Sequence, residues 1–381
     1  MTAANTTPRS GTSVAQPGML GQAKVRPEDA RRYNRSLVLS VLFREAPMSR
    51  ADLARATGLT RVTISALVAD LLEERYVVET GLRDDVRPGK PATLIDLDTE
   101  SFCIVTVDLS GNDVLTGAQL TVRGGVLRRD SLPRPTDGDE ILAAVLSLVE
   151  DLVAAAPSRV VGVGVGTPGI VDADGTVLSA PNFGWEDVEL ARVLGEVVDV
   201  PVIVTNDANA AVLGEFIFEG AAQDVLLIRV GRGVGSGLLT GGRVLAGAHL
   251  AGGELGHVTV GTDGGPLCAC GKVGCLEAWL AAGALRARLA SGDGDALRET
   301  GERLGIALAP VVGVLDISEI LLSGPPELLD GELREATIQT LRARTLTDFH
   351  DAVEIRMAGQ GDDIVLRGAA VPVLTTQLGV F

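Results

Sequence analysis

Apolar and polar residues follow two different patterns along the chain. From Arg26 to about Ile95 the pattern is that of a compact helical unit ending in two short strands. Beyond Glu100, β-rich runs alternate with helical patterns. We expect strands at Phe102–Leu109, Gly117–Val122, Val160–Val165 and Val200–Val204, and helices at Ile141–Ala155 and Ala208–Phe218. This alternation predicts an α/β architecture with a buried, largely parallel sheet.

Two short helices joined by a glycine are predicted near the N-terminus. Ser49 and Asp52, three residues apart, form a capping-box-like start for a helix at Arg50–Thr57. Gly58 ends that helix, and Thr60 caps a second one. Helix, glycine turn and helix at this length are typical of a helix-turn-helix.

The second helix, expected to run to about Glu74, has two distinct faces. The residues predicted to pack inward are Ile64, Leu67, Val68 and Leu71. The opposite face and its flanks carry the predicted DNA contacts, namely Arg61, Val62, Thr63, Ser65 and Ala66. Small side chains allow a helix to lie deep in the major groove, where Ser65 can hydrogen-bond a base edge. Arg61 is better placed for a phosphate or a guanine.

A basic hairpin follows these helices. Tyr76–Thr80 and Ala92–Leu97 are expected to pair, and the rigid tip between them contains Arg87, Gly89 and Lys90. Such a tip suits a wing that contacts the DNA backbone or minor groove. Residues 26–98 therefore read as a winged helix-turn-helix, the alternative being an ordinary helical hairpin with a surface loop.

Charge confines any DNA contact to this N-terminal segment. The chain carries a net charge of -17, but residues 1–98 hold 14 Lys and Arg against 12 Asp and Glu. The acidic remainder repels DNA. Residues 1–25 read as a disordered tail without the apolar run of a signal peptide, and no stretch has the pattern of a membrane span. We therefore expect a cytoplasmic protein without a membrane partner.

Three of the four cysteines fall within eight residues. Cys268, Cys270 and Cys275, together with His257, are the ligand set of a closed tetrahedral zinc site. With four protein ligands no coordination position remains for a substrate, so the expected Zn²⁺ is structural. The alternative is three reduced cysteines in a surface loop, which would be prone to oxidation.

These motifs resemble the ROK family of repressors, open reading frames and sugar kinases. The resemblance rests on Glu254-Leu-Gly-His257, Cys268-x-Cys-Gly-x-x-Gly-Cys-x-Glu277, Gly166–Gly169, Asn182–Trp185, Asn206–Ala211 and Leu366–Ala370. With a winged helix in front, the chain looks like the family's regulators, which include the N-acetylglucosamine and xylose repressors. The resemblance implies an actin/hexokinase-like fold of two lobes around a sugar cleft. The expected lobes are 99–205 with 365–381, and 206–364 with the zinc loop.

The resemblance also implies a set of sugar-binding residues. They are Asn206, Asp207, Glu254, His257 and Glu277. Carboxylates and amides suit a neutral polyol, because each can form several hydrogen bonds with its hydroxyls. In the family's kinases the residue matching Asp207 takes the proton from the attacking hydroxyl.

The segments that hold a nucleotide in those kinases are altered. Asp113 replaces a lysine, Arg232 replaces a small threonine, and Ser323-Gly324 is followed by two prolines. Phosphoryl transfer needs loops and cations that cradle the phosphates. We therefore expect a sensor without catalysis, which binds an inverted-repeat operator as a homodimer or homotetramer and responds to a sugar or sugar phosphate. The alternative is a sugar kinase, or a regulator that phosphorylates its effector.

Overall fold

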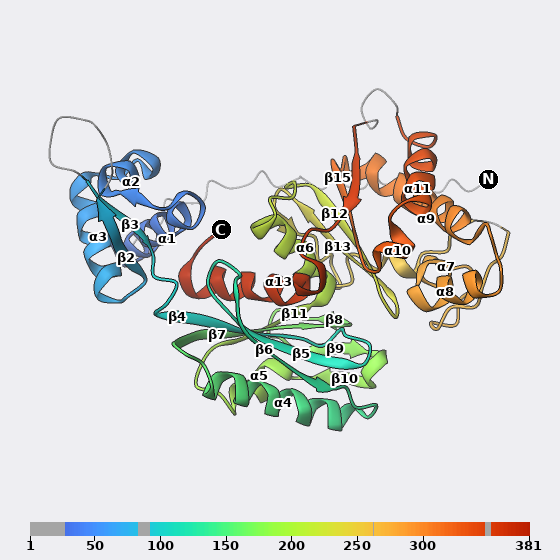
Figure 1. The fold of residues 1–381 in the computed structure, drawn as a ribbon, viewed down its shortest axis with the longest axis horizontal. Coiled ribbons are helices and arrows are strands. Elements are labelled where there is room, and N and C mark those ends of the chain that lie inside the picture. Colours follow the sequence, from blue (N-terminus) through green and yellow to red (C-terminus); the bar gives the residue numbers. More distant parts are fainter. Residues whose placement is uncertain (1–26, 83–91, 262, 347–351) are drawn as a thin grey trace, which may run out of the picture.

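The computed structural model describes residues 27–82, 92–261, 263–346 and 352–381 (Figure 1). The expected tail at 1–25 and the tip of the expected wing lie outside these residues. Along the described chain, a helical N-terminal unit is followed by one five-stranded sheet and then by a second. None of the described helices has the length and hydropathy needed to cross a membrane.

The N-terminal unit combines three helices with a sheet of order β1-β3-β2. Its elements are α1 (Pro27–Glu45), β1 (Met48–Ser49), α2 (Arg50–Thr57), α3 (Arg61–Glu73), β2 (Val77–Leu82) and β3 (Thr93–Leu97). The predicted bounds of α2 are confirmed, and α3 ends one residue earlier than expected. The predicted hairpin is also present, because β2 and β3 pair antiparallel. Helix α1 and strand β1 are additions that the sequence pattern did not delimit.

Local hydrogen bonds fix the turn between α2 and α3. The Ser49 hydroxyl accepts from Asp52 N at 3.2 Å, and the Asp52 carboxylate accepts from Ser49 N at 3.2 Å. Gly58 follows α2 with a φ of 70°, a left-handed conformation that glycine adopts without strain. Thr60 Oγ1 accepts from Thr63 N at 3.2 Å and so caps α3. The predicted capping box and both helix boundaries therefore have a direct physical cause.

The first sheet has the strand order β11-β7-β4-β5-β6. Its strands are β4 (Phe102–Asp108), β5 (Val114–Leu120), β6 (Val126–Pro133), β7 (Arg159–Thr167) and β11 (Val202–Asn206). Helices α4 (Gly138–Ala154) and α5 (Leu190–Gly195) cover one face, and α13 (Ile364–Val373) covers the other (Figure 1). Every residue of β4 is buried between these layers. Beside this sheet lies a small one formed by β8 (Ile170–Val171), β9 (Val177–Ala180) and β10 (Trp185–Val188).

The second sheet has the strand order β14-β13-β12-β15-β16. Its strands are β12 (Val225–Val230), β13 (Val234–Thr240), β14 (Arg243–Val244), β15 (Glu319–Ser323) and β16 (Glu354–Met357). The helices of this part are α6 (Asp207–Phe218), α7 (Leu276–Leu280), α8 (Ala282–Ala290), α9 (Ala296–Leu315), α10 (Pro326–Leu329) and α11 (Glu332–Arg342). Helices α9 and α11 pack side by side, and α7 and α8 lie next to α9.

The prediction of a largely parallel sheet is wrong for both sheets. In the first, β7 pairs parallel with β4 and β11, but β5 pairs antiparallel with β4 and β6. In the second, β15 pairs parallel with β12 and β16, whereas β13 pairs antiparallel with β12 and β14. The connections within β4-β5-β6 and β12-β13-β14 are short hairpins, and a parallel pair needs a crossover of about a dozen residues or more.

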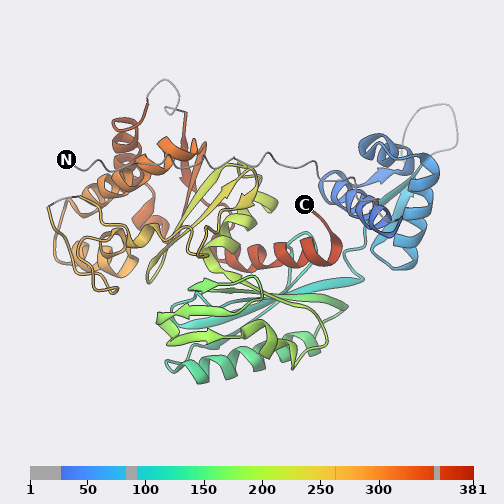
Figure 2. The ribbon, with the colours of Figure 1, turned by 180° about the vertical axis from the view of Figure 1, so that it is seen from behind.

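Helices α6 and α13 pack tightly together between the two sheets (Figure 2). A Cβ at Gly368 of α13 would lie 1.8 Å from the carbonyl oxygen of Ala210 on α6. On the opposite side of α13, a Cβ at Gly164 of β7 would lie 2.0 Å from the carbonyl oxygen of Ala369. Both close approaches therefore require glycine. Helix α13 thus packs against both β7 and α6, and the lobe boundaries, 99–205 with 365–381 and 206–364, stay a prediction.

The N-terminal unit shares one hydrophobic core with the C-terminal segment. The Ser40 hydroxyl on α1 donates to Gly379 O at 3.5 Å and accepts from Phe381 N at 3.4 Å. The Phe43 ring packs edge-on against Phe381 at 4.8 Å between centroids, and its centroid lies 6.2 Å from that of Phe218 on α6. Both views place the C-terminal end beside α1 (Figures 1 and 2). The position of α1 is thus tied to both α6 and the segment after α13.

Candidate functional site

Helix α3 presents a polar and small-residue face to solvent. Its buried residues are Ile64, Leu67, Val68 and Leu71, as predicted. Arg61, Val62, Ser65 and Ala66 are exposed, and the Val62 side chain is 80% exposed. Thr63 is half-buried, and its hydroxyl lies 2.9 Å from that of Thr60, so it is the least available of the five predicted contacts. The predicted wing contacts Arg87, Gly89 and Lys90 lie outside the described residues.

Ion pairs attach the far end of α3 to α1. The Arg35 guanidinium donates to the Glu74 carboxylate at 2.7 Å, and Arg31 pairs with Asp70. The hydrogen bond from Arg35 lowers the pKa of Glu74. Both pairs lie at the C-terminal end of α3, so the N-terminal turn with Arg61 and Val62 stays free for a partner.

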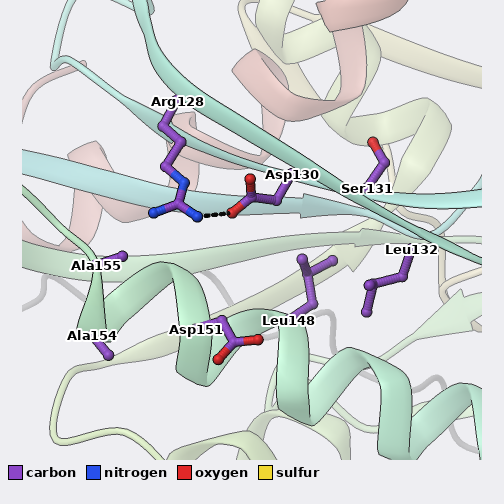
Figure 3. A pocket seen from close by; sticks show the side chains of 8 residues that line it. All are labelled: Arg128, Asp130, Ser131, Leu132, Leu148, Asp151, Ala154 and Ala155. Atoms are coloured by element: carbon purple, nitrogen blue, oxygen red, sulfur yellow. Dashed lines mark ion pairs between the residues drawn. The ribbon is translucent and has the colours of Figure 1, made fainter.

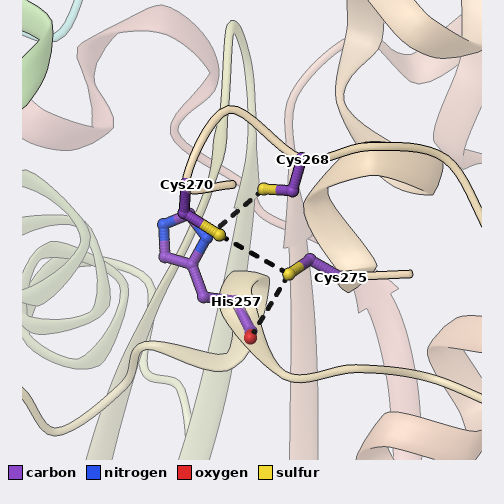
Figure 4. Close-up of side chains that lie close together, drawn as sticks. All are labelled: His257, Cys268, Cys270 and Cys275. Carbon is purple, nitrogen blue, oxygen red and sulfur yellow. Dashed lines mark hydrogen bonds between the residues drawn. The ribbon is translucent and has the colours of Figure 1, made fainter. Parts of the chain in front are cut away.

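The four predicted metal ligands come together (Figure 4). His257, Cys268, Cys270 and Cys275 each offer one ligand atom, and these atoms all lie within 4.8 Å of one another. Cys268 Sγ is 3.7 Å from His257 Nδ1, and Cys270 Sγ is 3.7 Å from Cys275 Sγ. A tetrahedral ion with Zn–S bonds of about 2.3 Å holds two sulfurs about 3.8 Å apart. The donor set and its spacing therefore fit Zn²⁺.

Glu277 joins this cluster to the second sheet. It lies in the first turn of α7, directly after Cys275 and Leu276. One carboxylate oxygen accepts from Cys268 Sγ at 3.5 Å, and the other accepts from Val234 N at 3.0 Å. Because Val234 begins β13, Glu277 links the loop that carries Cys268 to the start of that strand.

A small polar cavity lies where α6 meets β13. It has a volume of about 20 Å³ and is lined by Gly169, Asn206, Ala208, Asn209, Gly235, Ser236, Leu250, Gly252, Gly253 and Glu254. We call it the α6 cavity. Of the five predicted sugar ligands, Asn206 and Glu254 line it. Asp207 is the first residue of α6, while His257 and Glu277 belong to the adjoining metal cluster.

Asp207 forms an ion pair that the sequence did not predict. The Arg229 guanidinium on β12 donates to Asp207 Oδ2 at 2.9 Å, and the two side chains are 23% and 13% exposed. Burial raises the pKa of Asp207, while the charge of Arg229 opposes that shift and the nearby Asp108 adds to it. The one available signal was a charged residue within the apolar run Val225–Val230.

The first of the loops that would face a nucleotide has an internal hydrogen bond. Ser110 N donates to the Asp108 carboxylate at 2.8 Å, so this amide is not free for a phosphate. Asp113 and Arg232 are both exposed. The backbone at Gly324 has a φ of 144°, and Pro326 starts α10 two residues later. The prolines fix their own φ angles and so limit the conformations open to this segment.

A larger, open cavity lies elsewhere, between β6 and α4 (Figure 3). Its volume is about 540 Å³, and its lining residues are Arg128, Asp130, Ser131, Leu132, Leu148, Asp151, Ala154 and Ala155. Arg128 and Asp130 form an ion pair at 2.8 Å across its wall. None of the predicted site residues lines it, whereas Asn206 and Glu254 line the α6 cavity.

A helix-turn-helix unit joined to a two-lobed α/β body defines the class of this protein. The profile of the ROK family matches residues 104–376, and that of bacterial regulatory proteins of the crp family matches residues 47–75. The chain belongs to the ROK family.

Individual relatives include both regulators and kinases. The chain is 31% identical over 255 residues to a xylose repressor of Caldicellulosiruptor bescii, covering 65% of this chain and 63% of that protein. It is 31% identical to a glucokinase of Halalkalibacterium halodurans, covering 68% and 91%. The crystal structure of a ROK family transcriptional regulator, a homolog of the E. coli Mlc protein, matches with a TM-score of 0.79 at 25% identity, covering 92% and 96%.

Proposed function

We propose that the protein is a sugar-responsive transcriptional regulator that represses genes of carbohydrate metabolism. The observation that carries this proposal is the fusion of the exposed, small-residue face of α3 to a ROK body whose α6 cavity contains Asn206 and Glu254. The similarity to a xylose repressor and to a ROK transcriptional regulator supports it. In this function Arg61, Val62, Ser65 and Ala66, together with the wing, contact DNA.

The DNA partner is an inverted-repeat operator bound by a homodimer or homotetramer. A single winged helix covers too little DNA surface for regulatory affinity, so two must bind half-sites about one helical turn apart, or a multiple of it. The acidic body cannot anchor DNA itself.

The cluster of His257, Cys268, Cys270 and Cys275 holds one structural Zn²⁺ in this proposal. When bound, the ion supplies a fixed tetrahedral centre and leaves no open position for a substrate. Its role is to order the loop that precedes Glu277, and through Glu277 the adjoining start of β13. Polar groups of the sugar site are then in place before the sugar binds.

The body retains the kinase-like site without efficient catalysis. Asp207 would have to accept a proton while its carboxylate is engaged by Arg229, which stabilises the charged form. The nucleotide-facing loops also depart from the family pattern at Asp113, Arg232 and the segment Ser323–Pro326. The second candidate function is a sugar kinase, alone or combined with regulation. The raised pKa of Asp207, which suits a general base, and the similarity to a glucokinase favour it.

Sugar-dependent ATP turnover separates these two functions. We expect turnover far below the 1–100 s⁻¹ that is roughly typical of kinases, because the phosphate loops are altered and Asp207 is paired. A coupled assay with D-glucose, D-xylose and N-acetyl-D-glucosamine measures it. Turnover of about 1 s⁻¹ or more that Asp207→Asn abolishes would establish the kinase instead.

Helix α6 is the route by which sugar binding reaches the DNA-binding unit. Its first residue is Asp207, beside the cavity, and its last is Phe218, against Phe43 of α1. Twelve residues of α-helix span about 18 Å as one rigid element. A shift of its N-terminal turn on sugar binding therefore moves the surface on which α1 rests.

Operator binding with and without sugar tests the proposed function. We expect the wild-type protein to change its affinity for an inverted repeat, selected from random DNA, by about 5- to 150-fold on saturation with the sugar that stabilises it. Phe218→Ala should bind the same DNA and the same sugar but show a smaller change, because the contact with Phe43 is lost. Mobility-shift titrations measure both. An affinity that no sugar changes would contradict the sugar response, and an unaltered response in Phe218→Ala would contradict the route through α6.

A further inference from the structure

Asn206 is largely occupied by its structural role. Its side-chain oxygen accepts from Ala208 N and Asn209 N, both at 3.0 Å, and so caps α6. Its Nδ2 donates to Gly169 O at 2.9 Å. An amide oxygen has two lone pairs and an amide nitrogen two protons, so a single N–H of Asn206 remains for a ligand. The α6 cavity therefore needs another group to recognise a hydroxyl.

Asn209, near the start of α6, differs from Asn206 because its side-chain oxygen is not used in the structure. Its Oδ1 is buried and has no hydrogen-bond partner in the structure. Among the described residues, other buried side-chain atoms also lack a partner, but none of them lines the α6 cavity. A buried acceptor without a donor costs free energy, and native proteins retain such atoms where a ligand, water or function compensates.

We propose that Asn209 binds the sugar directly, by pairing its side-chain amide with one hydroxyl of the ligand. This assignment rests on the proposed sugar-binding function and adds a residue to its site. A hydroxyl fits whichever end of the amide faces the cavity, because it both donates and accepts. Glu254 lines the same cavity and offers a carboxylate to a second hydroxyl. The ligand class is thus a neutral aldose with two hydroxyls within reach of Asn209 and Glu254.

The size of the cavity requires it to open for a sugar. Its volume of about 20 Å³ has room for about one water molecule. Its lining includes Gly169, which follows β7 of the first sheet, and Gly235, which belongs to β13 of the second sheet. Separation of the lobes followed by closure around the sugar would bring Asn209 against the ligand.

This role and a purely structural role of Asn209 predict opposite results for Asn209→Ala. A structural amide would stabilise the free protein, so its loss would lower Tm. An unpaired acceptor gives no such stabilisation, so Tm without sugar should stay the same or rise. Affinity for sugar should fall by about tenfold or more, because a hydroxyl loses its partner.

The experiment uses the full chain and titrates D-glucose, D-xylose and the monodeoxy analogues of whichever of the two binds. Asn34→Ala, the same substitution on α1, serves as the control and should change no sugar affinity. We expect the affinity loss in Asn209→Ala to vanish for one deoxy analogue, the one that lacks the paired hydroxyl. An unchanged affinity for every sugar, or a lower Tm with an equal loss for all analogues, would overturn the assignment. If the wild-type protein binds neither sugar, the proposed sugar function fails for these ligands, and the role of Asn209 in binding them fails with it.

Discussion

Cys270→Ser should abolish both metal and sugar binding in a single step. Freshly purified, reduced wild-type protein should hold one zinc per chain, because four ligand atoms within 4.8 Å of one another form a complete tetrahedral set. Structural zinc in small peptides contributes about 10–16 kcal/mol of apparent binding free energy, so loss of one thiolate is severe. Disorder of the loop would then release Glu277 and the start of β13.

Metal analysis and sugar titration of matched variants check this expectation. Cys103→Ala removes the fourth cysteine, which is buried and lies outside the cluster. It should retain zinc and sugar binding even if its Tm falls. Absence of zinc from the wild-type protein would refute the metal assignment. Sugar binding that survives in a zinc-free Cys270→Ser variant would refute the link through Glu277.

Ser65→Arg and Glu254→Ala should separate DNA binding from sugar sensing. Ser65 lies on the exposed face of α3, where a long side chain prevents close approach to the base edges. We expect operator affinity to fall by about 100-fold or more with sugar affinity unchanged. Glu254 lines the α6 cavity, so its alanine variant should bind the operator normally and lose the response to sugar.

Paired titrations of operator and sugar distinguish the outcomes. Ser65→Ala is the matched control for the DNA side, because it removes one hydroxyl without adding bulk and should weaken operator binding only mildly. A Glu254→Ala variant that still responds fully to the same sugar would place the sensor outside the α6 cavity. Operator binding by Ser65→Arg at wild-type affinity would remove α3 from the DNA interface.

The N-terminal unit could be predicted from sequence because its signals are local. Ser49, Asp52, Gly58 and Thr60 act within three or four residues of their partners, so their spacing alone fixes α2 and the start of α3. The mixed strand order of the sheets could not be predicted in the same way. Apolar runs indicate where strands lie but not which strands pair, and the parallel pairs of β7 with β4 and β11 join segments far apart in the sequence.

The α6 cavity shows what a sequence motif cannot predict about the sugar-binding residues. The motif places Asn206 in the sugar set, but the structure gives most of its hydrogen bonds to the helix cap. Arg229 lies 22 positions from Asp207 in the sequence. An isolated arginine in an apolar strand does not indicate which residue it pairs with. The metal ligands were easier to predict from the sequence, because three of the four lie in one short loop.

The contact between α1 and the C-terminal segment also has a consequence for synthesis of the protein. Ser40 and Gly379 are 339 positions apart, which at about 5–20 residues per second means roughly 20 to 70 s of translation between them. During that interval Phe43 lacks the surface of Phe381, and for about the first half of it also that of Phe218. A nascent chain therefore carries an N-terminal unit whose α1 packs against α2 and α3 but not yet against the C-terminal segment. Helix α1 gains its full set of contacts only when residues 379–381 have been made.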